Sequence, residues 1–209
     1  MKISIIGSGQ VGGTLGSRLA RLGHEIIFGV REPTGDAMKA LLKKAGPNAS
    51  ATTIADALHK SPIVFFATPW NVVENVLDSV QNLRGKIIVD CTNPIAPGLQ
   101  LALGHTTSGA EQIAQRAVGA HVVKAFNTTG FENMQNPIFA KQAMTMFVCG
   151  DDQASNEAVA KLAEELGFHA CITGPLYHAR YLEPMAMLWI DMSMKQGRGR
   201  NFGFKILTR

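Results

Sequence analysis

Charged residues are scarce in this 209-residue chain: Asp, Glu, Lys and Arg make up 17% of it, whereas hydrophobic residues make up 46%. Average proteins carry about 25% charged residues. The composition therefore excludes a disordered or coiled-coil protein and leaves ample apolar material for a core. It also favours a protein that buries part of its surface in an oligomer. The length predicts one compact domain with a smaller elaboration.

Metal-binding and disulfide patterns are missing as well. Cys91, Cys149 and Cys171 are widely spaced, and the six histidines lack the spacing of metal ligands, so we expect no metal site and a reducing compartment. No apolar run approaches the about 18 to 20 residues that cross a bilayer, and no signal-peptide core is visible. We expect a cytoplasmic protein with no membrane partner.

Positive charge is in slight excess, with 20 Lys and Arg against 16 Asp and Glu. This excess is scattered, apart from a short cluster of Lys195, Arg198 and Arg200, whereas nucleic-acid proteins concentrate it on one face. We therefore expect no nucleic-acid partner. A small anionic ligand needs only a few cations.

Short apolar runs alternate with amphipathic stretches along the chain, a pattern typical of a parallel sheet covered by helices on both faces. The predicted strands are Ile3–Ile6, Glu25–Phe28, Ile63–Phe66, Lys86–Val89, Val122–Phe126, Thr145–Val148, His169–Ile172 and Phe202–Leu207. The predicted helices are Val11–Leu22, Ala37–Lys44, Asn71–Val80, Gln112–Ala117, one capped by Asp151 or Asp152 and stopped by Gly167, and Leu176–Met194, kinked near Pro184. The expected fold is a Rossmann doubly wound α/β sheet with a small C-terminal helical extension.

The sharpest motif is the run Gly7-Ser8-Gly9-Gln10-Val11-Gly12, a G-x-G-x-x-G between a predicted strand and a predicted helix. Gly7 permits a tight turn, Gly9 lets the backbone approach a pyrophosphate, and Gly12 allows close helix packing. The N-terminus of the helix then offers free N–H groups to phosphates. The context favours a dinucleotide site over an ordinary glycine turn.

Arg31, which follows the second predicted strand, indicates which dinucleotide the site would bind. An NAD site places a carboxylate near that position, whereas a guanidinium pairs with the 2′-phosphate of NADP. Ser8 adds a hydroxyl, and Glu32 is expected to point away. We therefore favour NADP(H), the alternative being a solvated Arg31 in a turn.

Several further motifs follow in order: Gly23-His24-Glu25, Thr68-Pro69-Trp70, Cys149-Gly150-Asp151-Asp152, Gly174-Pro175-Leu176, Gly197-x-Gly199 and the terminal Lys205-Ile206-Leu207. Together with the glycine motif, this order resembles that of the NADPH-dependent oxidoreductases of the deazaflavin (coenzyme F420) type, whose relatives include the reductase domains of membrane ferric reductases. The resemblance runs nearly end to end.

The resemblance implies roles for individual residues. It puts Ser8 and Arg31 at the 2′-phosphate, Thr68, Pro69 and Trp70 along the cofactor, and Asn93 and Pro94 near the nicotinamide. Asn127 stands where deazaflavin-reducing members often carry a histidine, and Lys124–Thr128 is closer to the ferric-reductase branch, whose acceptor is a flavin. The acceptor is therefore left open among coenzyme F420, FAD and FMN.

Hydride transfer between two rings needs positioning more than an acid or a base. Asn93, Asn127 and Thr128 are the candidate positioning residues, and each is as readily a residue that satisfies a turn. Trp70 is as often core, and Cys91 is interpreted as packing. His178, Arg180 and Glu183 are candidates for an acceptor cleft, although an Arg180–Glu183 pair is at least as plausible. Met185, Met187, Met192 and Met194 are better explained by a core or a dimer face.

The prediction is an NADPH-dependent oxidoreductase that passes a hydride between NADP(H) and a deazaflavin or flavin, a small-molecule acceptor. Residues 1–150 would form the NADP-binding Rossmann domain, and residues 151–209 an α/β extension that completes the acceptor cleft and a homodimer face. Two alternatives stay open: a non-catalytic NADP(H) redox sensor, and a reductase of a small carbonyl substrate, for which Lys124 is the nearest general-acid candidate.

Overall fold

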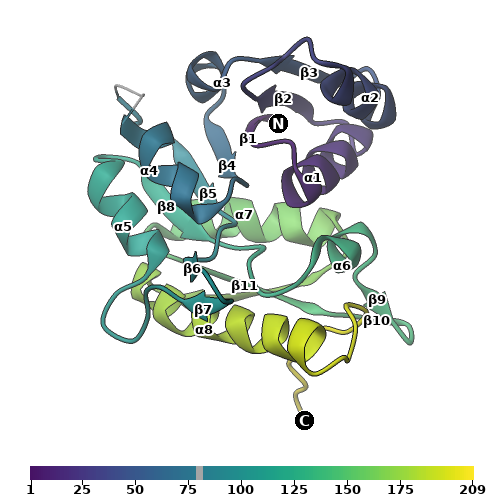
Figure 1. The fold of residues 1–209 in the computed structure, drawn as a ribbon, viewed down its shortest axis with the longest axis vertical. Helices are drawn as coiled ribbons and strands as arrows, with labels where there is room; N and C mark the ends of the chain where they lie inside the picture. The colour runs from purple at the N-terminus through teal and green to yellow at the C-terminus, as the bar shows by residue number, and fades with distance from the viewer. Residues whose placement is uncertain (79–81) are drawn as a thin grey trace.

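Eight short strands form one central sheet in the computed structural model, which describes residues 1–78 and 82–209 (Figure 1). They are β1 (Lys2–Ile6), β2 (Glu25–Gly29), β3 (Ala49–Thr52), β4 (Ile63–Phe66), β5 (Ile87–Asp90), β8 (His121–Lys124), β11 (Thr145–Gly150) and β12 (His169–Gly174). Two small hairpins, β6 (Ile95–Ala96) with β7 (Gln100–Leu101) and β9 (Ile138–Phe139) with β10 (Gln142–Ala143), lie outside it.

The strand order is β12-β11-β8-β5-β4-β1-β2-β3. From β3 to β8 every pairing is parallel, and the order reverses direction between β1 and β4. In open sheets of this kind, ligands bind outside the carboxyl ends of the strands at such a reversal. The expectation of a wholly parallel sheet is wrong at one place: β11 runs antiparallel to β8, and β12 runs parallel to β11.

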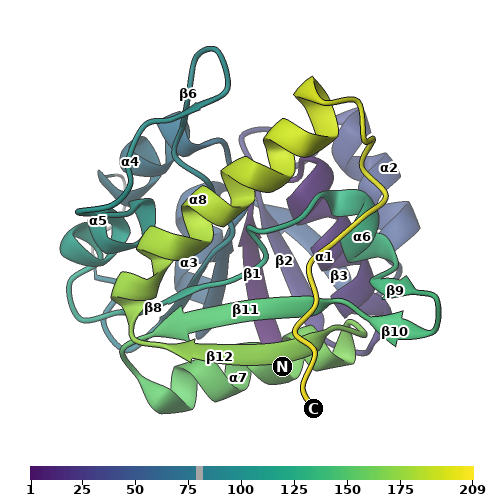
Figure 2. The same cartoon turned by 90° about the horizontal axis from the view of Figure 1, so that it is seen from below.

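Helices cover both faces of the sheet (Figure 2). They are α1 (Gln10–Arg21), α2 (Asp36–Ala45), α3 (Ile54–Lys60), α4 (Trp70–Asp78), α5 (Gly109–Arg116), α6 (Phe131–Gln135), α7 (Gln153–Glu165) and α8 (Ala179–Ile190), with a 3₁₀ turn at Leu176–His178 and a π turn at Asp191–Lys195. Side chains of α1, α2 and α7 join the core on the face of Ile5, and those of α3, α4, α5 and α8 the core on the face of Ile6. No helix in the described ranges combines the length and the apolar character that a membrane span requires.

Most predicted elements are confirmed within a few residues, and Asp152 caps α7 by accepting from the N–H of Ser155. The predicted helix Asn71–Val80 corresponds to α4, which is described as far as Asp78. The last two predicted positions lie outside the described residues. Helix α8 continues through Pro184 without a break.

The predicted strand Phe202–Leu207 is wrong. This segment runs along the end of α8 and across β11 (Figure 2) with one backbone bond to the sheet, from the N–H of Thr145 to the carbonyl of Phe204. Side chains hold it instead: Trp189 stacks on Phe202 with ring centroids 5.3 Å apart, and its indole N–H donates to the Phe202 carbonyl. The apolar side of α8 is therefore partly covered by the chain that follows it.

Candidate cofactor site

The glycine turn joins the end of β1 to α1, and two of its glycines are required by packing. Gly7 has φ +104°, and a Cβ there would lie 2.7 Å from the Ala67 carbonyl oxygen at the end of β4. A Cβ on Gly12 would overlap the carbonyl oxygen of Gly7. The turn can therefore press against the neighbouring strand only with glycine at both positions.

Gly9 differs because nothing lies within 4 Å of its Cβ position. It precedes α1, and no side chain caps the first turn of that helix. The unsatisfied N–H groups and the positive end of the helix dipole make such a turn a ready anion site. Beside it lies a groove of about 350 Å³ lined by Gly7, Ser8, Gly9, Gly29, Val30, Arg31, Ile54, Ala67, Thr68, Pro69 and Val72.

A second groove of about 340 Å³ adjoins the first and shares Ser8, Val30 and Arg31 with it. Arg31 forms no hydrogen bond or ion pair with any described residue, and Glu32, which lines the second groove, does not pair with it. An unpaired guanidinium between two grooves is available to an anionic ligand such as a phosphate.

Not every predicted cofactor residue lines this groove: Gln10, Val11, Gly12 and Trp70 do not. Trp70 is partly buried and packs against the core beside α5, where a Cβ on Gly109 would lie 3.0 Å from its ring. Gln10 is exposed and Val11 packs against the core beneath α1. Thr68 and Pro69, in contrast, line the groove as expected.

Asn93 and Asn127 meet at the carboxyl ends of β5 and β8. The side-chain amide of Asn93 donates to the Asn127 backbone carbonyl at 3.0 Å, and Asn127 Nδ2 donates to Asn93 Oδ1 at 3.0 Å and to the Leu182 carbonyl at 3.1 Å. Because two acceptors face Nδ2, the orientation of the Asn127 amide is fixed, with its oxygen turned away from both. Pro94, next to Asn93, is buried.

The loop that carries Asn127 holds two buried oxygens without a partner among the described residues, Asn127 Oδ1 and Thr128 Oγ1. Buried polar atoms are normally hydrogen-bonded, so an orphan in such a loop indicates a missing partner. A ligand amide fits, because its NH₂ group supplies two donors. The preceding residue, Phe126, is held at φ +60°, a strained conformation for a bulky side chain that is often found at functional sites.

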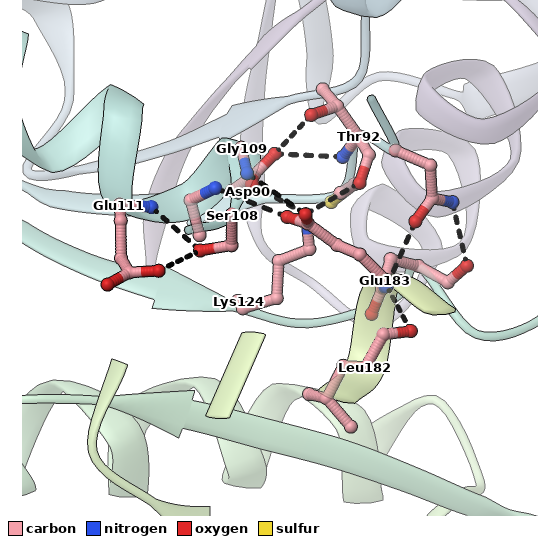
Figure 3. Close-up of polar contacts among 12 residues, drawn as sticks. Asp90, Thr92, Ser108, Gly109, Glu111, Lys124, Leu182 and Glu183 are labelled. Atoms are coloured by element: carbon pink, nitrogen blue, oxygen red, sulfur yellow. Dashed lines mark hydrogen bonds and ion pairs between the residues drawn. The ribbon is translucent and has the colours of Figure 1, made fainter. Parts of the chain in front are cut away.

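A buried ion cluster of Asp90, Lys124 and Glu183 lies behind this loop (Figure 3). Lys124 Nζ lies 2.7 Å from each of Asp90 Oδ2 and Glu183 Oε1, and all three side chains are fully buried. Burial alone would lower the pKa of Lys124, but the two carboxylates outweigh it and raise that pKa above its ordinary value. The two carboxylates therefore favour the protonated, cationic form of Lys124.

The ion cluster corrects one sequence-based interpretation and agrees with another. Glu183 does not pair with Arg180; instead Arg180 donates to Glu111 at 2.6 and 2.9 Å. Burial also raises the pKa of the Cys91 thiol well above its ordinary value, which agrees with a packing role. The signal for the cluster was a charged residue at the end of each of two mostly apolar strands, Asp90 in β5 and Lys124 in β8, which pair in register.

Among the remaining candidates, His178 packs against Gly174 and the Tyr177 ring. Met185, Met187 and Met192 are half-buried and Met194 is 55% exposed. No group of three or more His, Cys, Asp or Glu side chains suited to a metal ion occurs within the described part of the chain.

Comparisons with known proteins point to one family. The model of the family described as NADP oxidoreductase, coenzyme F420-dependent, matches residues 2–94. A candidate F420-dependent NADP reductase from Arthrobacter sp. FB24 is 30% identical with a TM-score of 0.88, and all of both chains is covered.

Two other matches are partial. The metalloreductase STEAP3 of Rattus norvegicus is 30% identical over 190 residues, 89% of this chain and 36% of the relative, so the chain spans about a third of its curated relative. A reductive aminase from Aspergillus terreus, solved with NADPH and ethyl levulinate, shares the fold with a TM-score of 0.69 at 22% identity, over 94% of this chain and 62% of that one.

Proposed function

The chain belongs to the family of coenzyme F420-dependent NADP oxidoreductases, and from that membership we propose that it transfers a hydride between NADP(H) and a deazaflavin or flavin ring. The observation that carries the proposal is the glycine turn at the carboxyl edge of the sheet, where Gly9 faces open space and Arg31 stands unpaired beside it. The bound nicotinamide supplies the hydride, and the protein supplies position and field.

The glycine turn and α1 would hold the pyrophosphate through backbone N–H groups. Arg31, with the Ser8 hydroxyl, would bind the 2′-phosphate from the wall shared by the two grooves. This arrangement supports a preference for NADP(H), because Arg31 lies on the wall shared by both grooves, whereas the carboxylates of Glu32 and Asp36 line only the second groove.

At the other end, Asn127 Oδ1 would accept from the carboxamide NH₂ of the nicotinamide, and Thr128 Oγ1 would complete its contacts. Both atoms belong to the strained loop after β8, on the same edge of the sheet as the glycine turn. These residues orient a ring and move no proton, which suits hydride transfer between two aligned rings.

Lys124 offers little support for reduction of a small carbonyl compound. A general acid must reach the reacting oxygen, but Lys124 is fully buried and engaged by two carboxylates. The deazaflavin or flavin acceptor is therefore the proposal we prefer.

We also propose that the protein is a homodimer that pairs through α8. Tyr181, Leu188 and Met194 are exposed by 62, 52 and 55%, a series of large apolar side chains on or just after one helix. Sedimentation equilibrium of the wild-type protein and of Leu188→Glu tests this: the variant should be monomeric.

The first experiment mixes the purified protein anaerobically with NADPH and, in parallel, coenzyme F420, FAD or FMN, and follows nicotinamide oxidation by absorbance. Rapid oxidation with one acceptor supports the proposal and identifies that acceptor. Tight NADPH binding without oxidation by any of them favours a redox sensor. Failure to bind NADPH overturns the proposal altogether.

A further inference from the structure

The ion cluster of Asp90, Lys124 and Glu183 calls for an explanation beyond stability. Withdrawing three charges from water is costly, and well-packed apolar residues often stabilise a core equally well. Hydrogen bonds join the cluster to Thr92, the residue before Asn93, and Glu183 directly follows Leu182, which bonds to Asn127 (Figure 3).

The first connection runs through Thr92. Asp90 Oδ1 accepts from the Thr92 N–H at 2.9 Å and from the Thr92 hydroxyl at 2.7 Å, while Lys124 Nζ donates to the Thr92 carbonyl at 2.7 Å. Three atoms of Thr92 are thus held by the cluster. The next residue is Asn93, whose Oδ1 accepts from Asn127.

The second connection runs through Glu183 on α8. Its carboxylate accepts from the N–H groups of Gly109 and Ala110 at 2.9 and 3.2 Å, at the N-terminus of α5, and from Lys124. This fixes the first turns of α8 against the sheet. The residue before it is Leu182, whose carbonyl is the second acceptor for Asn127 Nδ2.

We propose that Lys124 and Glu183 are positioning residues, which hold the acceptors that orient the Asn127 amide with its oxygen toward the ligand. The loop then presents an acceptor that selects an NH₂ group. The inference rests on the proposed function, because the carboxamide of the nicotinamide is the group that would be selected.

The test compares binding of NADP⁺, its 3-acetylpyridine analogue, in which a methyl ketone replaces the carboxamide, and adenosine 2′,5′-bisphosphate, which lacks the nicotinamide. Dissociation constants are measured by calorimetry for the wild type and for Glu183→Gln. The wild type should favour NADP⁺ over the analogue by about tenfold, the worth of about one net hydrogen bond. In Glu183→Gln this ratio should fall toward one, with binding of the bisphosphate unchanged.

Glu111→Gln is the matched control. Glu111 also joins α5 to α8, through Arg180, but touches neither Lys124 nor the asparagine loops. It should keep the full ratio even if it lowers the thermal midpoint. Asn127→Ala, which lacks the Oδ1 acceptor, gives the ratio of the two dissociation constants expected without that hydrogen bond.

A wild type that binds none of the three ligands would refute the proposed function. A wild-type ratio near tenfold that persists in Glu183→Gln would refute the positioning role alone, as would an equal loss of affinity for all three ligands. Thr92→Val is a milder variant, should Glu183→Gln fail to fold, because it removes only the hydroxyl bond to Asp90. It should lower the ratio by about twofold to threefold, and an unchanged ratio again contradicts the proposal.

Discussion

Gly9 and Gly12 belong to the same glycine motif, but a side chain at Gly9 would affect binding alone, whereas one at Gly12 would affect stability first. Gly9 has φ −69° and open space around its Cβ position, so Gly9→Val should fold with nearly wild-type stability and still lose dinucleotide binding, because the new side chain fills the place of the pyrophosphate. The measurement pairs thermal unfolding with NADPH titration. Near-normal affinity in a folded Gly9→Val would overturn the assignment of the turn.

Gly12→Ala is the contrasting variant. Its Cβ would overlap the Gly7 carbonyl oxygen, so the helix must move away from the turn. We expect destabilisation by about 1 to 3 kcal/mol, the usual cost of overpacking, with binding reduced as a consequence. Urea unfolding with intrinsic fluorescence measures the difference.

Arg31 governs the choice of nucleotide in the proposed site. Arg31→Glu replaces a charge-assisted pair, worth about 1.5 to 3 kcal/mol, with repulsion, so the preference for NADPH over NADH should disappear. The ratio of the two dissociation constants reports this directly. Thermal stability should stay near that of the wild type, since no described residue bonds to Arg31. Unchanged discrimination would remove Arg31 from the pocket.

At the scale of elements, α8 is held in place partly by the segment that follows it, which includes Phe202. Trp189 is 3% exposed, stacks on Phe202 and donates to its carbonyl. Trp189→Ala should therefore cost about 3 to 5 kcal/mol and release residues 200–206 to proteolysis. Leu188→Ala, at a neighbouring position that is 52% exposed, should change stability by less than about 0.5 kcal/mol. Urea unfolding and limited proteolysis measure both effects, and equal losses in the two variants would contradict this picture.

The sequence predicts the long periodic elements well, because apolar runs such as Ile63–Phe66 can be buried only as central strands. It misses the short ones. Helix α3 has seven residues and too few apolar positions for a clear period, although the Thr53 cap, which accepts from the N–H of Asp56, is a local signal. Strand β3, with the sequence Ala-Ser-Ala-Thr, becomes a strand by pairing at the edge with β2.

For the site, too, the sequence predicts the parts that are local in the chain and misses the contacts between distant elements. The glycine turn and Arg31 are local in sequence, so their proximity follows from one β-turn-α unit. The pairing of Asn93 with Asn127 depends on strand order, and the Glu183 contact depends on where α8 docks, since 59 residues separate Glu183 from Lys124. A tryptophan at a helix start can face either the groove or the core, and Trp70 packs against the core.

At the scale of the whole molecule, three buried groups make the fold sensitive to alkali: the thiols of Cys91 and Cys149 and the ammonium of Lys124, and burial raises the pKa of Cys91 well above its ordinary value. Burial raises the pKa of the Cys149 thiol from its ordinary 9.0 to about 12, and the carboxylates raise that of Lys124. The unfolded chain then loses protons that the folded chain keeps, so the unfolding free energy is steady below about pH 9 and falls as the pH rises from there. The urea midpoint should be lower at about pH 10.5 than at about pH 8.

The variant Cys149→Ala isolates the contribution of the Cys149 thiol to the pH dependence of the unfolding free energy. The decline in the urea midpoint between the two pH values should be shallower in this variant, because only the Cys91 and Lys124 contributions are left. A midpoint independent of pH in the wild type would show that none of the three groups is linked to unfolding.

The strand order gathers the site from distant parts of the chain: Gly9 and Arg31 come from its beginning, Asn127 from beyond the middle, and Leu182 from near its end. A segment such as residues 2–94, the part that the family model matches, would hold only one end of the dinucleotide in the proposed site. A bound cofactor of the proposed kind therefore ties the earliest and latest parts of the polypeptide together. At a hundredfold excess over its dissociation constant it would add about 2.7 kcal/mol to the unfolding free energy. The lifetime of the protein in a cell would then rise and fall with the supply of its own cofactor.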